Sequence, residues 1–292
     1  MKILIIGASG LVGSHCTHVL KNEFYDVVGT HLNFQTPETV YYDPLSVSEK
    51  NLQLDNVKPD IIIHCGALTN VDYCENNERE SEIATVLSTK VLVDYCNRNN
   101  AKLIYLSTDY VFDGEKGPYP ESTPTNPINV YGKHKLEAEL LVKSLDKYII
   151  ARITNVYGEE ERSKNFIARL VIWLQQNEVK KLDLPIDQFA TPVYAGDIAR
   201  MLLCLIRDDK TGIYNLSSTD YYDRYHLALK VKSFFRDNTS VILNPVQTAH
   251  LNQAAKRPLK GGLLNIKFIQ QYPDFEFSNV DSFLKTLVNN EI

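Results

Sequence analysis

The chain has 292 residues, of which 44% are hydrophobic and 23% are charged, and its formal net charge is −5 at pH 7. This composition is typical of a folded globular protein and too apolar for a disordered one. The acidic balance argues against a dedicated nucleic-acid binder, which usually carries a basic excess. The sequence has no run of roughly 18 apolar residues, so we expect no membrane span.

The cysteines indicate a reducing environment. There are five, an odd number, and none forms a Cys-x-x-Cys pair: Cys16, Cys65, Cys74, Cys96 and Cys204. This pattern argues against a disulfide framework and against a structural zinc site. We therefore expect free thiols, no metal centre and a cytoplasmic location.

Apolar runs of strand length alternate with helical stretches in the first half of the chain. Strands are expected at residues 2–6, 26–30, 60–65, 102–107 and 148–153, and helices at 11–21, 78–99 and 130–144. The strands are apolar throughout rather than alternating, which is typical of parallel strands buried on both faces. The sequence thus predicts an α/β fold, a Rossmann-type doubly wound parallel sheet, over residues 1–157.

The alternation of strands and helices becomes less regular after residue 157, where Pro, Asn and Asp become frequent between the apolar stretches. Further helices are expected at residues 165–176, 195–207 and 224–235. We predict a smaller C-terminal substrate-binding lobe over residues 158–292, with part of segment 190–216 returning to the sheet domain.

A glycine-rich turn follows the first predicted strand, with Gly7, Gly10 and Gly13 spaced three apart. Glycines permit a tight turn and let a pyrophosphate approach the backbone, while the following helix N-terminus offers free N–H groups. The alternative is an ordinary strand–helix turn. The second strand ends at Thr30 without an acidic residue, which permits NADP. We expect NADPH as the cofactor, with NADH as the alternative.

A hydroxyl and a Tyr–Lys pair supply candidate catalytic groups. Thr108 follows a predicted strand, and Tyr131 and Lys135 share one face of a predicted helix. A phenol has a pKa of about 10, and a nearby ammonium lowers it. The lysine could also hold the nicotinamide ribose, and Thr108 could orient a substrate carbonyl. Because the chain has 17 tyrosines, a chance match on a solvated helix face is the alternative.

The order of these motifs resembles the extended, sugar-nucleotide-modifying branch of the short-chain dehydrogenase/reductase superfamily, and within it the dTDP-4-dehydrorhamnose reductases. The resemblance covers nearly the whole chain. It rests most strongly on the segments Ser-Thr-Asp-Tyr-Val-Phe-Asp-Gly at 107–114 and Asp-Gln-Phe-Ala-Thr-Pro within 187–199, with further support from residues 64–75, 152–158 and 212–216.

The resemblance implies a role for each matching residue. The catalytic residues would be Thr108, Tyr131 and Lys135. The cofactor, besides Tyr131 and Lys135, would contact Gly7, Ser9, Gly10, Leu11, Val12, Thr30, Asp43, Gly66, Ala67 and Leu68. The substrate would contact Thr69, Val71, Thr108, Asp109, Tyr110, Asn155 and Arg257. Two of these have simpler alternatives, since Asp109 could cap a turn and Asn155 could bond neighbouring backbone.

Arg257 is also singled out by charge. It forms a basic pair with Lys256 just before Pro258, and an arginine fork suits the oxygens of a diphosphate. A solvated surface pair is the alternative.

Some positions depart from the pattern of these reductases. Asn155 stands where they often carry a tryptophan, Val86 replaces a helix asparagine, and Lys260-Gly261 replaces Asn-Ser. These departures leave the hydride chemistry intact and the identity of the sugar open.

Together these features predict NAD(P)H-dependent reduction of a 4-keto-6-deoxy nucleotide sugar, with the proton coming from Tyr131. The alternatives are an epimerase or dehydratase of the same fold, or a non-catalytic NADP-binding subunit resembling the methionine adenosyltransferase β subunit. A nucleotide sugar is the expected partner, with no nucleic acid and no membrane, and a homodimer is left open.

Overall fold

The apolar runs of the sheet domain form seven parallel strands in the order β11-β6-β5-β4-β1-β2-β3. The computed structural model describes residues 1–46, 48, 51–176, 178–235 and 239–289. The strands are β1 (Lys2–Ile6), β2 (Asp26–His31), β3 (Thr39–Tyr41), β4 (Ile61–His64), β5 (Lys102–Thr108), β6 (Tyr148–Ile153) and β11 (Gly212–Asn215). The predicted Rossmann-type parallel sheet is confirmed.

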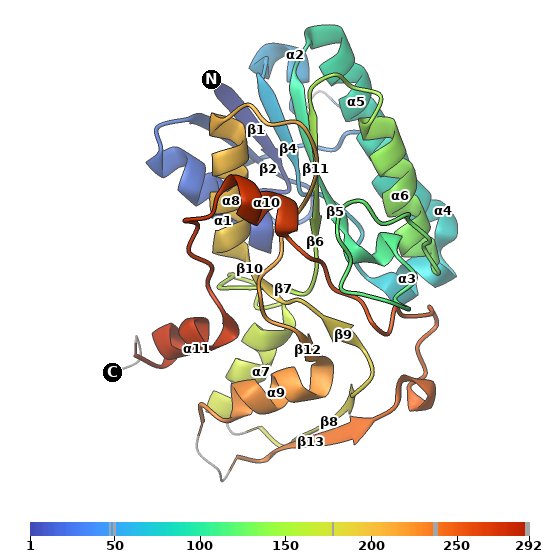
Figure 1. Ribbon diagram of the computed structural model, residues 1–292. Helices are drawn as coiled ribbons and strands as arrows, with labels where there is room; N and C mark the ends of the chain where they lie inside the picture. The colour runs from blue at the N-terminus through green and yellow to red at the C-terminus, as the bar shows by residue number, and fades with distance from the viewer. Residues whose placement is uncertain (47, 49–50, 177, 236–238, 290–292) are drawn as a thin grey trace.

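Helices cover both faces of this sheet (Figure 1). They include α1 (Leu11–Asn22), α5 (Ser88–Asn99), α6 (Val130–Val142) and α8 (Ala195–Arg207). Successive strand residues face opposite sides, so Ile5 joins the core under α1 and α8, whereas Ile6 joins the core under α5 and α6. Burial on both faces explains why the strands are apolar throughout.

The helix expected over residues 78–99 contains an irregularity. It consists of α4 (Glu78–Glu82), a π-helical turn η1 (Ile83–Leu87) and then α5. The hydroxyls of Ser88 and Thr89 donate to the carbonyl oxygens of Ala84 and Thr85, at 2.7 and 2.6 Å. Hydroxyls that donate to carbonyl oxygens of the preceding turn compete with the regular hydrogen bonds of the helix. The hydrophobic period of the sequence does not reveal this competition.

Several short elements were not predicted. In the sheet domain these are β3, β11, α2 (Leu54–Val57), α3 (Val71–Asn76) and the 3-10 turn η2 (Asp109–Val111). They span three to six residues each, which is too short for a hydrophobic period to show.

The C-terminal half builds a second, smaller body below the sheet (Figure 1). Its core packs α7 (Phe166–Gln175) and α9 (Arg224–Lys232) against the parallel pair β8 (Lys180–Pro185) and β13 (Val241–Val246). Two further strand pairs are β7 (Val156–Tyr157) with β10 (Val193–Tyr194), and β9 (Phe189–Ala190) with β12 (Tyr222–Asp223). We call this body the lobe.

The chain crosses between the two bodies more than once. Helix α8 packs on the sheet beside α1, and β11 forms an edge strand of the sheet. The last elements are the 3-10 turn η3 (Thr248–His250), α10 (Ile266–Gln271) and α11 (Val280–Asn289). The division of the chain at residue 157 stays a prediction.

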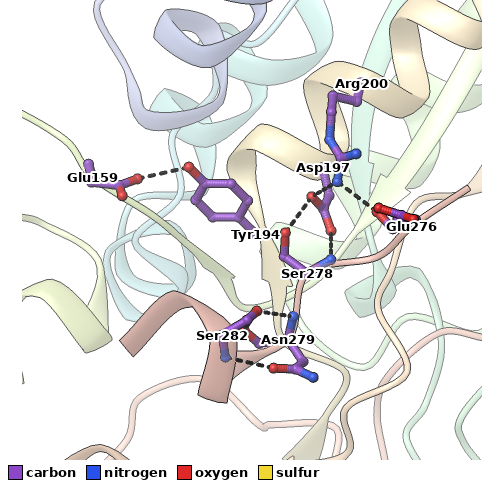
Figure 2. A network of polar contacts seen from close by, with 8 residues as sticks. All are labelled: Glu159, Tyr194, Asp197, Arg200, Glu276, Ser278, Asn279 and Ser282. Carbon is purple, nitrogen blue, oxygen red and sulfur yellow. Dashed lines mark hydrogen bonds and ion pairs between the residues drawn. The ribbon is translucent and has the colours of Figure 1, made fainter. Parts of the chain in front are cut away.

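A polar network ties the C-terminal segment to α8 (Figure 2). The buried carboxylate of Asp197 accepts hydrogen bonds from the backbone N–H of Ser278 at 2.6 Å and from Arg200 at 2.6 Å. Arg200 also donates to the carbonyl oxygen of Glu276 at 2.8 Å. The carboxylate lies in the first turn of α8, where the helix dipole favours negative charge.

All five cysteines are free thiols. In the described part of the chain, no helix combines the length and apolarity that crossing a membrane requires. Within the same ranges, no cluster of three or more His, Cys, Asp or Glu side chains could hold a metal ion.

Candidate active site

The carboxyl ends of the central strands open into a cleft of about 970 Å³, and the lobe forms its opposite wall. Open α/β sheets bind their ligands at this edge. The cleft brings together fourteen of the predicted site residues: Gly7, Gly10, Leu11, Val12, Ala67, Thr69, Val71, Thr108, Asp109, Tyr110, Tyr131, Lys135, Asn155 and Arg257. Five others are not among its lining residues: Ser9, Thr30, Asp43, Gly66 and Leu68.

The glycine turn is closed so tightly that side chains would not fit. Gly7 has a φ of +79°, and a Cβ on Gly13 would lie 2.3 Å from the carbonyl oxygen of Gly7. Gly10 forms the N-cap of α1 without a side-chain cap. The backbone N–H groups in the first turn of α1 therefore lie beside a turn built of glycines. This arrangement fits the pyrophosphate of a dinucleotide.

Thr30 supports this turn from behind rather than lining the cleft. Its hydroxyl accepts a hydrogen bond from the N–H of Gly7 at 3.3 Å, and its carbonyl oxygen accepts one from Ala8 at 2.8 Å. Asp43 accepts a hydrogen bond from the N–H of Leu45 at 3.0 Å. The roles predicted for these residues toward the cofactor stay predictions.

Gly66 and Leu68 also lie next to cleft residues. The backbone nitrogen of Gly66 would be 3.1 Å from a Cβ on Gly7, so the loop after β4 packs directly on the glycine turn. Leu68 packs in a small apolar cluster with Cys74 and Tyr131. Both residues therefore shape the cleft from outside it.

The three predicted catalytic residues meet at the end of β5. Thr108 is the last residue of β5, and Tyr131 and Lys135 lie one turn apart on α6; all three are buried. The hydroxyl of Thr108 donates to the carboxylate of Asp109 at 3.3 Å and accepts from the N–H of Tyr110 at 3.2 Å, and it lies close enough to the phenol of Tyr131 to influence its pKa. Gly132 allows this approach, because a Cβ there would lie 2.2 Å from the carbonyl oxygen of Tyr110.

Tyr131 holds its proton firmly. Burial raises the pKa of its phenol well above the usual value, and the nearby hydroxyl of Thr108 offsets this only in part. The negative charge of Asp109 raises this pKa further. The predicted lowering of the phenol pKa by a lysine is wrong for this structure, because burial dominates.

The ammonium of Lys135 has other partners. Its Nζ donates to the carbonyl oxygen of Leu106 at 2.6 Å and lies 4.1 Å from the ring centroid of Tyr105. Burial lowers the pKa of Lys135 to about 7, although the carboxylate of Glu139 acts in the opposite direction. Lys135 therefore titrates near neutral pH.

A buried ion pair lies behind the catalytic residues. Arg152 of β6 donates to both carboxylate oxygens of Glu139 on α6, at 2.9 and 2.7 Å, and both side chains are at most 1% exposed. The hydroxyl of Ser107 donates to the same carboxylate at 2.6 Å. This network fixes α6 to the ends of β5 and β6, and with it the position of Tyr131.

Asp109 joins the strand end to a distant segment. Its carboxylate accepts hydrogen bonds from the hydroxyl of Thr154 at 2.8 Å and from the N–H of Gly262 at 3.1 Å. The carboxylate thus anchors the segment around Gly262 to the end of β5. Burial raises the pKa of Asp109, and these hydrogen bonds oppose that rise.

The lobe wall carries positive charge. Asn155, with a φ of +42°, accepts a hydrogen bond from Arg224 at 3.1 Å, and the Arg224 guanidinium lies 4.6 Å from the ring centroid of Phe166. Arg257 differs, because it forms an ion pair with Asp72 at 2.8 Å and its side chain is 9% exposed. Arg257 is thus neither a solvated surface residue nor an unpaired cation.

Four basic residues of the cleft were not assigned to the site from the sequence. They are Arg162, Lys164, Arg169 and Arg224. The first three fall within one short segment after β7, and that local basic clustering was a signal that could have identified them.

The fold and the cleft define a member of the extended short-chain dehydrogenase/reductase superfamily. The chain belongs to the RmlD substrate binding domain family, whose model matches residues 1–290. It is 29% identical to the dTDP-4-dehydrorhamnose reductase of Aggregatibacter actinomycetemcomitans, over 98% of both chains. It is also 29% identical to the methionine adenosyltransferase 2 subunit beta of Xenopus tropicalis, over 80% of this chain and 72% of that protein.

A solved structure supports the same assignment. The dTDP-4-dehydrorhamnose reductase from Bacillus anthracis, determined in complex with NADP, superposes with a TM-score of 0.86, at 27% identity and over 99% of each chain. The bound NADP of that relative agrees with the cofactor that the sequence predicts here.

Proposed function

We propose that this protein uses NADPH to reduce the keto group of a 4-keto-6-deoxy nucleotide sugar, as the dTDP-4-dehydrorhamnose reductases of its family are named for doing. One observation carries the proposal. The neighbouring hydroxyls of Tyr131 and Thr108 line the same cleft as the glycine turn at Gly10. A proton donor and a dinucleotide site thus share one cavity.

The residues present fit a nicotinamide dinucleotide. Gly7, Gly10 and the first turn of α1 would hold its pyrophosphate, and Lys135 would lie on the nicotinamide side of the cleft, next to Tyr131. When bound, the dinucleotide supplies the hydride.

The protein's own groups supply the proton and the orientation. The raised pKa of Tyr131 keeps the phenol protonated at neutral pH, which suits a general acid that donates to the oxygen of a ketone during reduction. The hydroxyl of Thr108 donates to Asp109 at 3.3 Å and lines the same cleft, so by rotating it can donate to the ketone oxygen and orient it. Burial of both groups excludes water from the proton transfer.

The lobe wall suits the diphosphate of a nucleotide sugar. Arg224 and Arg169 line the cleft, and the planar fork of a guanidinium binds phosphate oxygens in pairs. Stacking on Phe166 and the hydrogen bond to Asn155 hold Arg224 in place. Arg257 remains a predicted substrate residue, and it forms an ion pair with Asp72.

Steady-state consumption of NADPH tests the proposal. The wild-type protein is offered a panel of nucleotide sugars, some with a 4-keto-6-deoxy group and some with intact hydroxyls that an epimerase or dehydratase would use. We expect turnover of the keto sugars alone. Tight NADPH binding without turnover of any keto sugar would contradict a reductase.

A regulatory role is the second candidate, because the methionine adenosyltransferase subunit matches most of this chain. The buried set of Thr108, Tyr131 and Lys135, which line one cleft, supports catalysis instead, since a purely binding subunit does not need it. Adding the protein to a methionine adenosyltransferase catalytic subunit separates the two candidates. A regulatory subunit would co-elute with it and change its rate.

A further inference from the structure

One arginine of the cleft reaches from the lobe side to the sheet domain. Arg162 lies in the loop between β7 and α7, yet its Nη2 is 3.6 Å from the point where a Cβ on Gly10 would lie. Its guanidinium carbon is also 5.2 Å from the ring centroid of Phe34. Phe34 lies just beyond the end of β2 at His31. Arg162 thus bridges the glycine turn and the segment after β2.

The loop that carries Arg162 is fixed to its surroundings on both sides. Glu159 accepts a hydrogen bond from the hydroxyl of Tyr194 at 3.0 Å (Figure 2), and its carbonyl oxygen lies 3.2 Å from a ring nitrogen of His15 on α1. Within the loop, Asn165 donates from its backbone to the carboxylate of Glu160 at 2.6 Å. The position of Arg162 is therefore preorganised.

The guanidinium of Arg162 has unused hydrogen-bonding capacity. Its Nε is buried and has no hydrogen-bond partner within the described ranges of the chain. Across the same ranges no carboxylate forms an ion pair with Arg162, unlike Arg257, which pairs with Asp72. A buried guanidinium N–H without an acceptor is costly. Arg162 lines the cleft without an ion-pair partner in these ranges, so its guanidinium can bind an anionic ligand there.

We propose that Arg162 binds the 2′-phosphate of NADPH and sets a preference for NADPH over NADH. In Rossmann folds the adenosine ribose lies at the end of the second strand, where an acidic side chain selects NAD and an arginine accommodates the 2′-phosphate. Strand β2 ends here at Thr30-His31, without an acid. The required arginine comes instead from the loop after β7, beside Phe34 and Gly10.

The guanidinium of Arg162 can bind either of two groups of the dinucleotide, the 2′-phosphate or the pyrophosphate. The contact with Phe34 favours the 2′-phosphate, because Phe34 lies on the ribose side of the turn. Only the 2′-phosphate distinguishes NADPH from NADH, so a comparison of these two ligands separates the two assignments.

The inference rests on the proposed function only through the dinucleotide, and binding titrations without any sugar substrate test it. Dissociation constants for NADPH and NADH are measured by fluorescence for the wild type, Arg162→Ala and Lys133→Ala. Lys133 is an exposed cation of α6 and is not among the lining residues of the cleft, so it controls for general electrostatics. Competition by 2′,5′-ADP and by 5′-ADP provides a second readout, and thermal unfolding checks that each variant folds.

We expect Arg162→Ala to weaken NADPH and 2′,5′-ADP by about tenfold to a hundredfold, the effect of losing a charged hydrogen bond. NADH and 5′-ADP should bind as before, and Lys133→Ala should bind all four ligands nearly as the wild type does. Equal weakening of NADPH and NADH would overturn the assignment in favour of the pyrophosphate. Unchanged binding of both would remove Arg162 from the site while leaving the reductase proposal intact. A wild type that binds neither dinucleotide would overturn both proposals.

Discussion

The two walls of the cleft are assembled in different ways. The sheet wall takes Thr108, Tyr131 and Lys135 from neighbouring stretches of sequence, and regular elements hold all three. The lobe wall takes Arg162 and Arg224 from segments that lie far apart along the chain. The sheet wall is buried and backed by an internal ion pair, whereas the lobe wall carries several cations.

This difference assigns proton transfer to the sheet wall and ligand binding to the lobe wall. Burial on the sheet wall changes pKa values, which is what a proton-donating group requires. Guanidinium groups on the lobe wall can bind the phosphates of ligands. We therefore expect substitutions on the sheet wall to change stability and kcat, and substitutions on the lobe wall to change KM and Kd.

The largest effect is expected behind the sheet wall. Glu139→Gln leaves the buried guanidinium of Arg152 without a charged partner, and breaking a buried ion pair in this way costs about 3–5 kcal/mol. Chemical denaturation measures the loss of unfolding free energy. Glu137→Gln, at an exposed position of the same helix, serves as the control. Equal stability of both variants would show that the pair does not hold α6 in place.

Replacing the proton donor should affect the rate and spare binding. Tyr131→Phe removes the hydroxyl but keeps the ring in its apolar cluster. We expect kcat to fall at least about a hundredfold, the lower end for general acid catalysis, with an unchanged dissociation constant for NADPH. Tyr73→Phe, at an exposed tyrosine, should have normal activity. Near-normal turnover of the Tyr131 variant would remove this residue from the mechanism.

On the lobe wall, two arginines should differ in effect. Arg224→Ala should raise KM for the nucleotide sugar by about tenfold to a hundredfold, through loss of a charged hydrogen bond. Arg257→Ala should raise it less, because Asp72 already shares the charge of Arg257. Steady-state kinetics at saturating NADPH measures both variants. A larger effect at Arg257 would reverse this assignment of the phosphate contact.

The smallest effect concerns pH. The pKa of Lys135 is about 7 in the folded protein, against an ordinary 10.5, so between these values the unfolded chain carries a proton that the folded chain lacks. Stability therefore rises with pH in this window. Relative to Lys135→Met, the wild type should gain about 1 kcal/mol of unfolding free energy from pH 7 to pH 8. A constant difference between the two proteins would mean that Lys135 stays charged when buried.

The sheet wall could largely be predicted from the sequence, because its signals are local. Continuous apolar runs gave the parallel strands, and the spacing of Tyr131 and Lys135 placed both on one helix face. The partner of Lys135 could not be predicted. Its contact with the carbonyl oxygen of Leu106 depends on packing between α6 and β5, as does the raised pKa of Tyr131.

The lobe wall could not be predicted in the same way. Arg162 and Arg224 match no motif, and they become neighbours of the cleft only through tertiary packing. The strands β8 and β13 were also missed, since both mix apolar residues with polar ones or proline, as in Lys-Lys-Leu-Asp-Leu-Pro. The prediction for Arg257 placed it in the cleft but missed its ion pair with Asp72.

Transfer of an isotope label tests the central claim most directly. The wild type and Tyr131→Phe are each incubated with a 4-keto-6-deoxy nucleotide sugar and NADPH carrying deuterium at the transferable nicotinamide position. Mass spectrometry and NMR then locate the label. We expect one deuterium at the former keto carbon of the sugar with the wild type, and little or none with the Tyr131 variant over the same time. Bound NADPH that keeps all of its deuterium in the presence of the wild type would contradict this expectation.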